Sequence, residues 1–291
     1  MKAVFILLSA WACYFTSFFL AALACGVISR RGFLPLHIPA IIGVGAYAFA
    51  GFAGRGGISP LVSALGALIG ASVFGALTGL LFIRLRGASA ALATIAIQLA
   101  FDQYAQSAEW TGGSAGLWQG IPVLPPAQKL IVCAIVIAIC SFLYRCYQHA
   151  AVTRQVTADG ISPTLYRSVS TISSTRPLVA ASTLLGFIGG CAGLVIPLQM
   201  GFISPSSFSL HLGLLYVGIV LLVGHERIFA IAIGSLFVSI LPEVLRIFGF
   251  GGVETSAWRS VIVGLAVLAV VLLQAPRASF ASAGCAEAAT K

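Results

Sequence analysis

The sequence PLVSALGALIGASVFGALTGLLFI, residues 60–83, contains no charged residue, and Arg84 and Arg86 follow it directly. The hydrocarbon core of a bilayer is about 30 Å thick and an α-helix rises about 1.5 Å per residue, so roughly 20 apolar residues cross it. This stretch therefore predicts a membrane-spanning helix that ends at a basic hairpin.

The same alternation of apolar runs and short polar breaks continues along the chain. Hydrophobic residues make up 59% of the 291 residues and charged residues only 8%, whereas a soluble domain carries about 25% charged residues. We expect an all-α, polytopic transmembrane helix bundle that forms one membrane-embedded domain over residues 1–291, with its first helix retained rather than removed as a signal peptide. The runs predict about nine spans, between eight and ten, at residues 3–28, 36–52, 60–83, 88–105, 130–143, 178–199, 210–223, 228–247 and 258–273.

Basic residues between the runs predict the orientation. Those that follow the third and fifth runs are Arg84, Arg86, Arg145, Arg154, Arg167 and Arg176. Because loops rich in Lys and Arg stay in the cytoplasm, we expect a cytoplasmic segment at 145–177 and periplasmic loops at 107–128 and 200–209. An odd number of spans would then place the N-terminus outside.

Two of the apolar segments, residues 32–54 and 201–224, are interrupted by Gly and Pro. Broken helices at membrane depth are tolerated where protein or water satisfies the freed backbone groups, which is typical of a translocation path. Matching residues lie 170 positions apart, which suggests an inverted repeat: Pro35 with Pro205, Gly43 with Gly213, and Gly54 with Gly224.

Several classes of function are disfavoured. The 16 Lys and Arg residues give a net charge of +9 but are scattered between apolar runs, so we expect no nucleic-acid binding. The chain has no nucleotide-binding loop, no paired metal-binding histidines and no recognisable nucleophile with its partners, so we expect neither an enzyme nor a metal site. Five cysteines inside apolar runs are interpreted as small packing residues: Cys13, Cys25, Cys133, Cys140 and Cys191.

Polar residues inside apolar runs are few and costly to bury, so each requires a reason. Gln98 and Asp102 lie one helical turn apart and either line a pathway or bond to a neighbouring helix. Glu243 and Arg246 are three residues apart and are interpreted as an interfacial ion pair. Gln98 and Asp102, together with residues of the two broken segments, form the candidate translocation path: Gly45, Tyr47, Gln98, Asp102, Ser204 and Pro205.

The small residues Gly186, Gly189, Gly190 and Gly193 form a stripe that predicts close helix packing.

The segment 145–177 either docks a motor protein or is a solvated basic loop. Residues 158–161, Ala-Asp-Gly-Ile, predict a short helix ended by its glycine, and Tyr166 and Arg167 follow it. The candidate coupling residues are Asp159, Gly160, Ile161, Tyr166 and Arg167.

Five motifs in order resemble the M-type subunit of the branched-chain amino acid ABC permease family. The resemblance as a whole covers about residues 43 to 273. The motifs are Gly43-Val44-Gly45-Ala46-Tyr47; Arg84-Leu85-Arg86-Gly87 with Leu92-Ala93-Thr94-Ile95; Thr111-Gly112-Gly113-Ser114-Ala115-Gly116-Leu117; Gly201-Phe202-Ile203-Ser204-Pro205-Ser206-Ser207-Phe208-Ser209; and Pro242-Glu243-Val244-Leu245-Arg246.

The resemblance implies a subunit of the bacterial inner membrane that translocates branched-chain amino acids, or related small amino acids or amides, by alternating access. It implies a heterodimer with a second permease subunit, two cytoplasmic ATPase subunits that use ATP, and a periplasmic substrate-binding protein. No cofactor is expected in this chain. Asp159-Gly160-Ile161 falls where the family places its motor-contacting segment, and Thr111, Gly112, Gly113 and Ser114 fall in its periplasmic loop.

Two segments depart from the family pattern. Residues 151–157, Ala-Val-Thr-Arg-Gln-Val-Thr, replace an acidic and alanine-rich stretch, and Gly224-His225-Glu226-Arg227 replaces a glycine-rich linker. The first departure is expected to affect the strength of contact with the ATPase. The second is expected to affect the flexibility of the bend at 224–227.

Two other classes of function stay open. An ion-coupled secondary transporter would need an intramembrane carboxylate, for which Asp102 and Glu243 are the candidates. A channel or structural membrane component would need no coupling segment at all.

Overall fold

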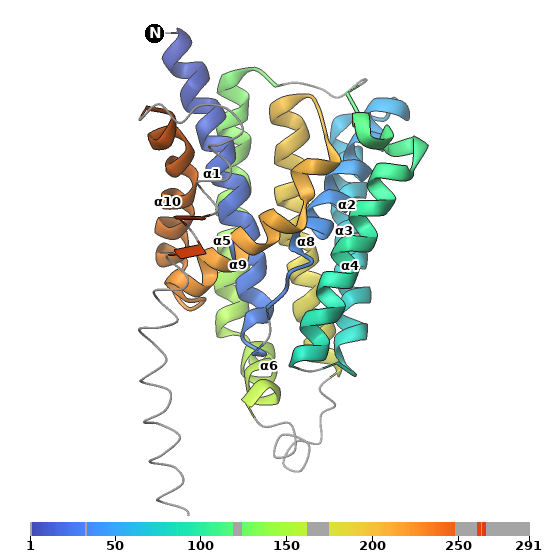
Figure 1. The fold of residues 1–291 in the computed structure, drawn as a ribbon, viewed down its shortest axis with the longest axis vertical. Coiled ribbons are helices and arrows are strands. Elements are labelled where there is room, and N and C mark those ends of the chain that lie inside the picture. Colours follow the sequence, from blue (N-terminus) through green and yellow to red (C-terminus); the bar gives the residue numbers. More distant parts are fainter. Residues whose placement is uncertain are drawn as a thin grey trace, which may run out of the picture.

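A computed structural model of the chain describes residues 2–32, 34–85, 87–118, 124–161, 175–247, 261–262 and 264–265, without the side chains of 2–8, 10, 55 and 242–247. The described part is a helix bundle in which the only strand-like pairing is one antiparallel bridge between Leu117 and Ile203 (Figure 1). The helices are α1 (Lys2–Ser29), α2 (Ile38–Ala50), α3 (Pro60–Phe82), α4 (Ala88–Ser107), α5 (Pro126–His149), α6 (Ala151–Ile161), α8 (Thr175–Met200), α9 (Leu210–Val223) and α10 (Ile228–Ile247); the short turns are η1 (Gly51–Arg55), η2 (Glu109–Thr111), η3 (Gly113–Ala115) and η4 (Pro205–Phe208).

Every predicted span except the last coincides with a helix. The span predicted at 258–273 lies almost wholly outside the described residues. Five helices in the described part are long and apolar enough to cross a membrane: Trp11–Ser29, Pro60–Phe82, Pro126–His149, Thr175–Met200 and Pro205–Val223. The all-α class is confirmed for the part of the chain that the structure describes, and the count of nine spans stays a prediction.

The interval 145–177 differs from the loop that the sequence predicts. Helix α5 continues to His149, α6 follows after one residue, and α8 begins at Thr175. A helix satisfies its own backbone hydrogen bonds, so it can continue from the apolar region into water without a break. The apolar runs therefore predict which residues lie in the bilayer, but they do not predict where the helices end.

Segments with the same predicted orientation lie at the same end of the bundle (Figure 1). The start of α1, the turns η2 and η3 and the end of α8 lie toward the upper end, whereas α6, the end of α3 and the start of α4 lie at the lower end. Two hydrogen bonds join the two predicted periplasmic loops, from the Leu117 amide to the Ile203 carbonyl (2.8 Å) and back (2.9 Å).

Helix α8 is the centre of the bundle and packs against α1, α2 and α3. Its glycines allow this approach, as the sequence predicted. A Cβ atom on Gly75 of α3 would lie 2.7 Å from the Cα of Gly186, and one on Gly45 of α2 would lie 3.0 Å from the Cα of Gly190. Real Cβ contacts are longer, so these helices meet through backbone surfaces that have no side chain between them.

The five cysteines inside the apolar runs are buried and free, as expected for packing residues. The Sγ atoms of Cys13 on α1 and Cys133 on α5 lie 3.4 Å apart.

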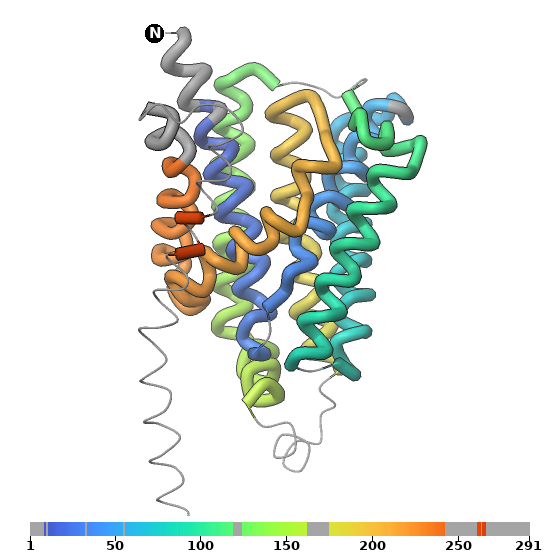
Figure 2. The backbone as a smooth tube through the Cα atoms, viewed as in Figure 1, coloured from blue at the N-terminus to red at the C-terminus, as the bar shows by residue number. Residues whose placement is uncertain are grey.

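The two interrupted segments form short helices that begin inside the bundle. Figure 2 shows that the chain runs back from the lower end of α1 before α2 begins, and back from the upper end of α8 before α9 begins. The two short helices also advance in opposite vertical directions in this view. The inverted repeat itself stays a prediction.

Gly186→Ala is expected to lower the thermal unfolding midpoint of the purified protein in detergent. The added methyl group would meet the backbone of α3, and such overpacking costs about 1–3 kcal/mol. Gly70→Ala is the matched control, because nothing lies within 4 Å of a Cβ atom at that glycine of α3. Equal midpoints for the two variants would contradict close packing of α3 on α8.

Candidate functional site

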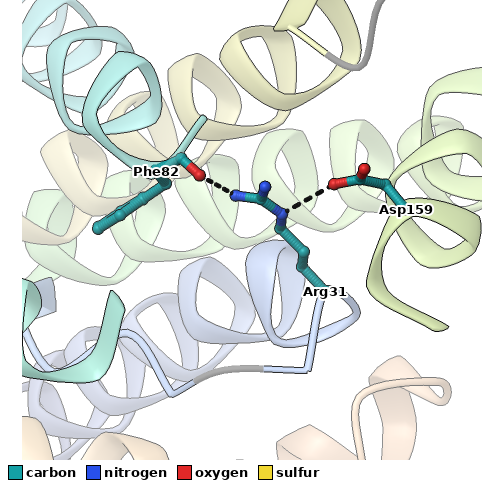
Figure 3. A network of polar contacts seen from close by, with 3 residues as sticks. All are labelled: Arg31, Phe82 and Asp159. Atoms are coloured by element: carbon teal, nitrogen blue, oxygen red, sulfur yellow. Dashed lines mark hydrogen bonds and ion pairs between the residues drawn. The ribbon is translucent and has the colours of Figure 1, made fainter. Parts of the chain in front are cut away.

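Asp159, predicted to contact a motor protein, is buried and forms an ion pair. Its Oδ2 accepts a hydrogen bond from Nε of Arg31 at 3.2 Å, and each of the two side chains is only 4% exposed. Nη1 of Arg31 donates to the carbonyl of Phe82 (Figure 3). One guanidinium thus joins the ends of α1 and α3 to α6.

The position of Arg31 suits its charge. The last carbonyls of a helix have no partner within the helix and carry partial negative charge, so a cation there is favourable. Arg31 follows the last turn of α1, and Phe82 is the last residue of α3. Arg31 was not among the predicted site residues, because two arginines after an apolar run also follow from the orientation rule alone.

Gly160 has a different role from the predicted helix terminator. It lies inside α6 and is not among the glycines with positive φ. A Cβ atom at this position would lie 2.9 Å from the Cα of Arg31. The glycine is therefore needed so that α6 can lie directly on the end of α1.

The opposite face of α6 is exposed. Buried positions are Thr153, Val156 and Asp159, and Ile161 is 79% exposed. The exposed residues recur at helical spacing and form one face, which we call the α6 outer face: Ala151, Arg154, Ala158 and Ile161. Tyr166 and Arg167, the other predicted coupling residues, lie outside the described residues.

The bend at 224–227 is held by Arg30, which follows α1, and by two side chains of α5. The carbonyl of His225 accepts hydrogen bonds from the hydroxyl of Tyr144 (2.6 Å) and from Nη2 of Arg30 (3.4 Å). The carbonyl of Glu226 accepts one from Nε2 of Gln148 (2.7 Å). This segment replaces the glycine-rich linker of the family pattern, and its backbone is fixed on the bundle in this structure.

In the interior of the bundle, Gln98 connects the two broken helices. Its Oε1 accepts a hydrogen bond from the amide of Ala40, in the first turn of α2, at 2.8 Å. Its Nε2 donates to the carbonyl of Phe208, at the end of η4, at 2.7 Å and to Oδ1 of Asp102 at 2.9 Å. Gln98 is completely buried, and these bonds satisfy backbone groups that the breaks leave free.

Asp102 extends this network to α9, because its carboxylate accepts a hydrogen bond from the amide of Leu210, the first residue of α9. Of the two predicted roles for Gln98 and Asp102, bonding to neighbouring segments is the one that this geometry displays. Their role in a translocation path stays a prediction. The side chains of Glu243 and Arg246 lie outside the described residues.

The first family motif places its residues on different faces of α2. A Cβ atom on Gly43 would overlap the ring of Phe101, so this glycine admits an aromatic side chain of α4. Gly45 faces α8, and Tyr47 is buried against Phe101 and Phe208, with ring centroids 6.4 and 5.8 Å away.

The predicted periplasmic loop motif folds as two successive turns. The hydroxyl of Thr111 donates to the carbonyls of Ala105 (2.8 Å) and Ala108 (2.6 Å) and fixes η2 on the end of α4. Gly112, Gly113 and Gly116 have φ of +82°, +59° and +80°, a conformation that favours glycine.

This loop meets the other broken segment through the Leu117–Ile203 bridge. Ser204 precedes η4, where its hydroxyl bonds to that of Ser206 at 2.8 Å, and Pro205 begins the turn. The predicted path residues Tyr47, Gln98 and Asp102 thus lie near one another and near η4, whereas Gly45 is committed to helix packing.

These features define a multi-pass membrane protein with broken helices and a short helix exposed at one end. The sequence matches the family described as "Branched-chain amino acid transport system / permease component" over residues 7–272. The chain therefore belongs to the family of branched-chain amino acid transport permeases, whose members are transport components. Comparisons with curated proteins and with solved structures gave no match.

Asp159→Asn and Arg31→Met are each expected to destabilise the protein strongly. Removing one partner of a buried ion pair leaves the other charge uncompensated, at a cost of about 3–5 kcal/mol. Thermal unfolding in detergent would measure this, with Arg154→Gln on the α6 outer face as control. In the double variant Arg31→Met with Asp159→Asn the two losses should be less than additive; strict additivity would count against the pairing.

Gln98→Leu is expected to loosen the starts of α2 and α9. The substitution keeps the side-chain size but leaves the Ala40 amide and the Phe208 carbonyl without this partner, and a lost buried hydrogen bond costs about 1–3 kcal/mol for each group. Hydrogen exchange of the amides around 40 and 210 should speed up. Gln103→Leu, at an exposed position of α4, is the control and should leave exchange unchanged.

Proposed function

We propose that the chain is the membrane-spanning permease subunit of an ABC importer in the bacterial inner membrane. It moves branched-chain amino acids, or related small amino acids or amides, by alternating access. Two separate cytoplasmic ATPase subunits supply the energy, a second permease subunit completes the membrane unit, and a periplasmic binding protein delivers the solute.

The observation that carries this proposal is the anchored helix α6. A permease without its own nucleotide-binding loop needs a surface on which an external motor can act. The α6 outer face is short, exposed and largely apolar, as expected for a docking surface. The buried ion pair fixes the other side of α6 to the ends of α1 and α3, so a displacement of α6 is passed on to these helices.

The predicted periplasmic end supports delivery from a binding protein. The two loops are joined to each other at Leu117 and Ile203, and Trp118 beside the bridge is 68% exposed. Exposed aromatic residues are frequent in protein contacts. Both loops also connect to the Gln98 network, so contact there can affect the broken helices.

The ion-coupled secondary transporter is not favoured. Membership of the permease family points to a transport system with several components. The Asp102 carboxylate already bonds to Gln98 and to the Leu210 amide, which gives it a structural task.

Ile161→Ser is expected to weaken docking of the ATPase by about fivefold or more, because truncation of an important apolar contact typically costs more than about 1 kcal/mol. The measurement is ATP-dependent uptake of radiolabelled leucine into vesicles that contain the chain with its partner subunits. Leu61→Ser is the matched control: Leu61 is 76% exposed but lies at the start of α3, away from α6.

Loss of uptake in Ile161→Ser with normal uptake in Leu61→Ser would support the proposal. Uptake by this chain alone, driven by an ion gradient and independent of ATP, would overturn it.

A further inference from the structure

Helix α4 lies at the side of the bundle opposite α10 in the view of Figure 1. It is 20 residues long, yet it is not among the five helices of the described part that are both long and apolar enough to cross a membrane. Its neighbour α3, which is also exposed along one side, is among them. Helix α4 is therefore less suited to contact with lipid than α3.

The polar residues of α4 lie on two opposite sides of the helix. Gln98 faces the bundle and bonds to the segments around α2 and α9. At 3.6 residues per turn, Gln103 lies about 140° around the helix from Gln98 and Ser89 about 180°. Both residues are exposed, and both fall inside the predicted span 88–105. Because polar groups on a membrane helix face protein or water, the outer side of α4 also meets protein or water.

The exposed residues on this outer side follow a seven-residue repeat. They recur at alternate spacings of three and four positions and form a line that we call the α4 outer seam: Ser89, Leu92, Ala96, Leu99, Gln103 and Gln106. Two helices that pack side by side meet along a line with this spacing. In membranes, small residues let the backbones of two helices approach, and Gln side chains bond from one helix to the other. The seam thus has the shape and the hydrogen-bonding groups for contact with another helix.

Neither water nor lipid suits the whole of the α4 outer seam. Leu92 is 67% exposed and Leu99 is 49% exposed, and apolar side chains of this size are unfavourable on a surface that faces water. The amide of Gln103 is unfavourable in lipid. On α3, by contrast, every exposed residue after Pro60 is Leu, Val or Ile, which suits lipid. A helix of another protein satisfies both the apolar and the polar residues of the seam.

A cavity of about 470 Å³ lies beside the α4 outer seam, between α4, α2 and α3. Tyr47 and Phe74 line it from α2 and α3, and Ala100 and Tyr104 line it from α4, where both are exposed next to the seam. None of the described residues in its wall is charged. A lipid chain would fit this apolar wall as well as a protein side chain would. The seam, and not the cavity, therefore distinguishes protein from lipid at this side of the bundle.

We infer that the α4 outer seam packs against a membrane-spanning helix of the second permease subunit, with the amides of Gln103 and Gln106 bonded to polar groups of that helix. This inference rests on the proposed function, in which the second permease subunit is the one other component that lies in the membrane. The inner side of the same helix carries Gln98. Helix α4 would thus lie between the second subunit and the two broken helices, and a displacement of one subunit against the other would reach the starts of α2 and α9.

A photo-crosslinking amino acid tests the contact directly. Benzoylphenylalanine in place of Ala96, in the middle of the seam, is expected to form a covalent adduct with the second permease subunit when membranes that contain the assembled transporter are illuminated. The matched control has benzoylphenylalanine in place of Ile69, which is 65% exposed on α3 and should form no adduct with protein. Mass spectrometry of the adduct identifies the partner.

Ala96→Trp is expected to lower the amount of second permease subunit that co-purifies with the chain by about tenfold, because a large side chain forced into a packed contact holds the two helices apart. Ile69→Trp is the matched control and should leave this amount unchanged. Both residues are exposed in the single chain, so neither substitution overpacks its own core. Equal amounts of the two variants in the membrane fraction would show that both fold.

An adduct with lipid alone, or no adduct, at position 96 would overturn this inference and leave the permease function standing, provided that the second subunit still co-purifies. An adduct with a second copy of this chain would also overturn it, as would equal recovery of the second subunit with the two tryptophan variants. If the unaltered chain co-purifies with no second permease subunit and supports no ATP-dependent uptake, the proposed function fails, and this inference with it.

Discussion

The buried ion pair between Arg31 and Asp159 is the interaction on which the lower end of the bundle depends. Desolvating two charges is expensive, and their attraction repays this only when the geometry is good and further hydrogen bonds are made. Here the same guanidinium also bonds to the carbonyl at the end of α3, so the desolvated cation serves three elements at once. Gly160 lets the backbone of α6 approach closely enough for the pair to form. A helix with an exposed outer face is thereby fixed on an otherwise apolar bundle.

The interior of the bundle obeys the same constraint with an uncharged group. A helix that begins inside a membrane leaves amide and carbonyl groups that water cannot reach. Gln98 has both a donor and an acceptor, so one side chain can bond to the amide of Ala40 and to the carbonyl of Phe208. Asp102, which has only acceptors when ionised, bonds to the amide at the start of α9. An amide and a carboxylate side chain one turn apart suit this position, because the two breaks leave two backbone amides and one carbonyl without partners inside a helix.

The sequence predicted the helices well because apolar runs of the right length have few alternatives in a membrane protein. It predicted the ends of α5 poorly, at 130–143 instead of Pro126–His149, because hydropathy reports the apolar layer and a helix can extend beyond it. It placed Asp159 on a docking surface, although the side chain is buried, since a partner 128 residues away cannot be recognised in one sequence. The glycines of α8 were interpreted correctly, because small residues at helical spacing in a membrane helix commonly allow another helix to pack closely. In contrast, the cavity beside Tyr47 depends on the relative positions of α2, α3 and α4, which a local sequence pattern does not predict.

The distribution of packing indicates where the bundle can change shape. Helices α2, α3 and α8 meet through glycine backbones, and such interfaces have little freedom to slide because any shift brings backbone atoms into conflict. Helix α4 instead packs against α2 and against the irregular segments η3 and η4, and the cavity separates it from α3. Its attachment relies on the hydrogen bonds of Gln98, which can break and re-form at modest cost. A displacement of α6 would therefore be passed through the ends of α1 and α3 to the group of α2, α3 and α8, which would move as a unit, and the resulting strain would fall on α4 and on the start of α9.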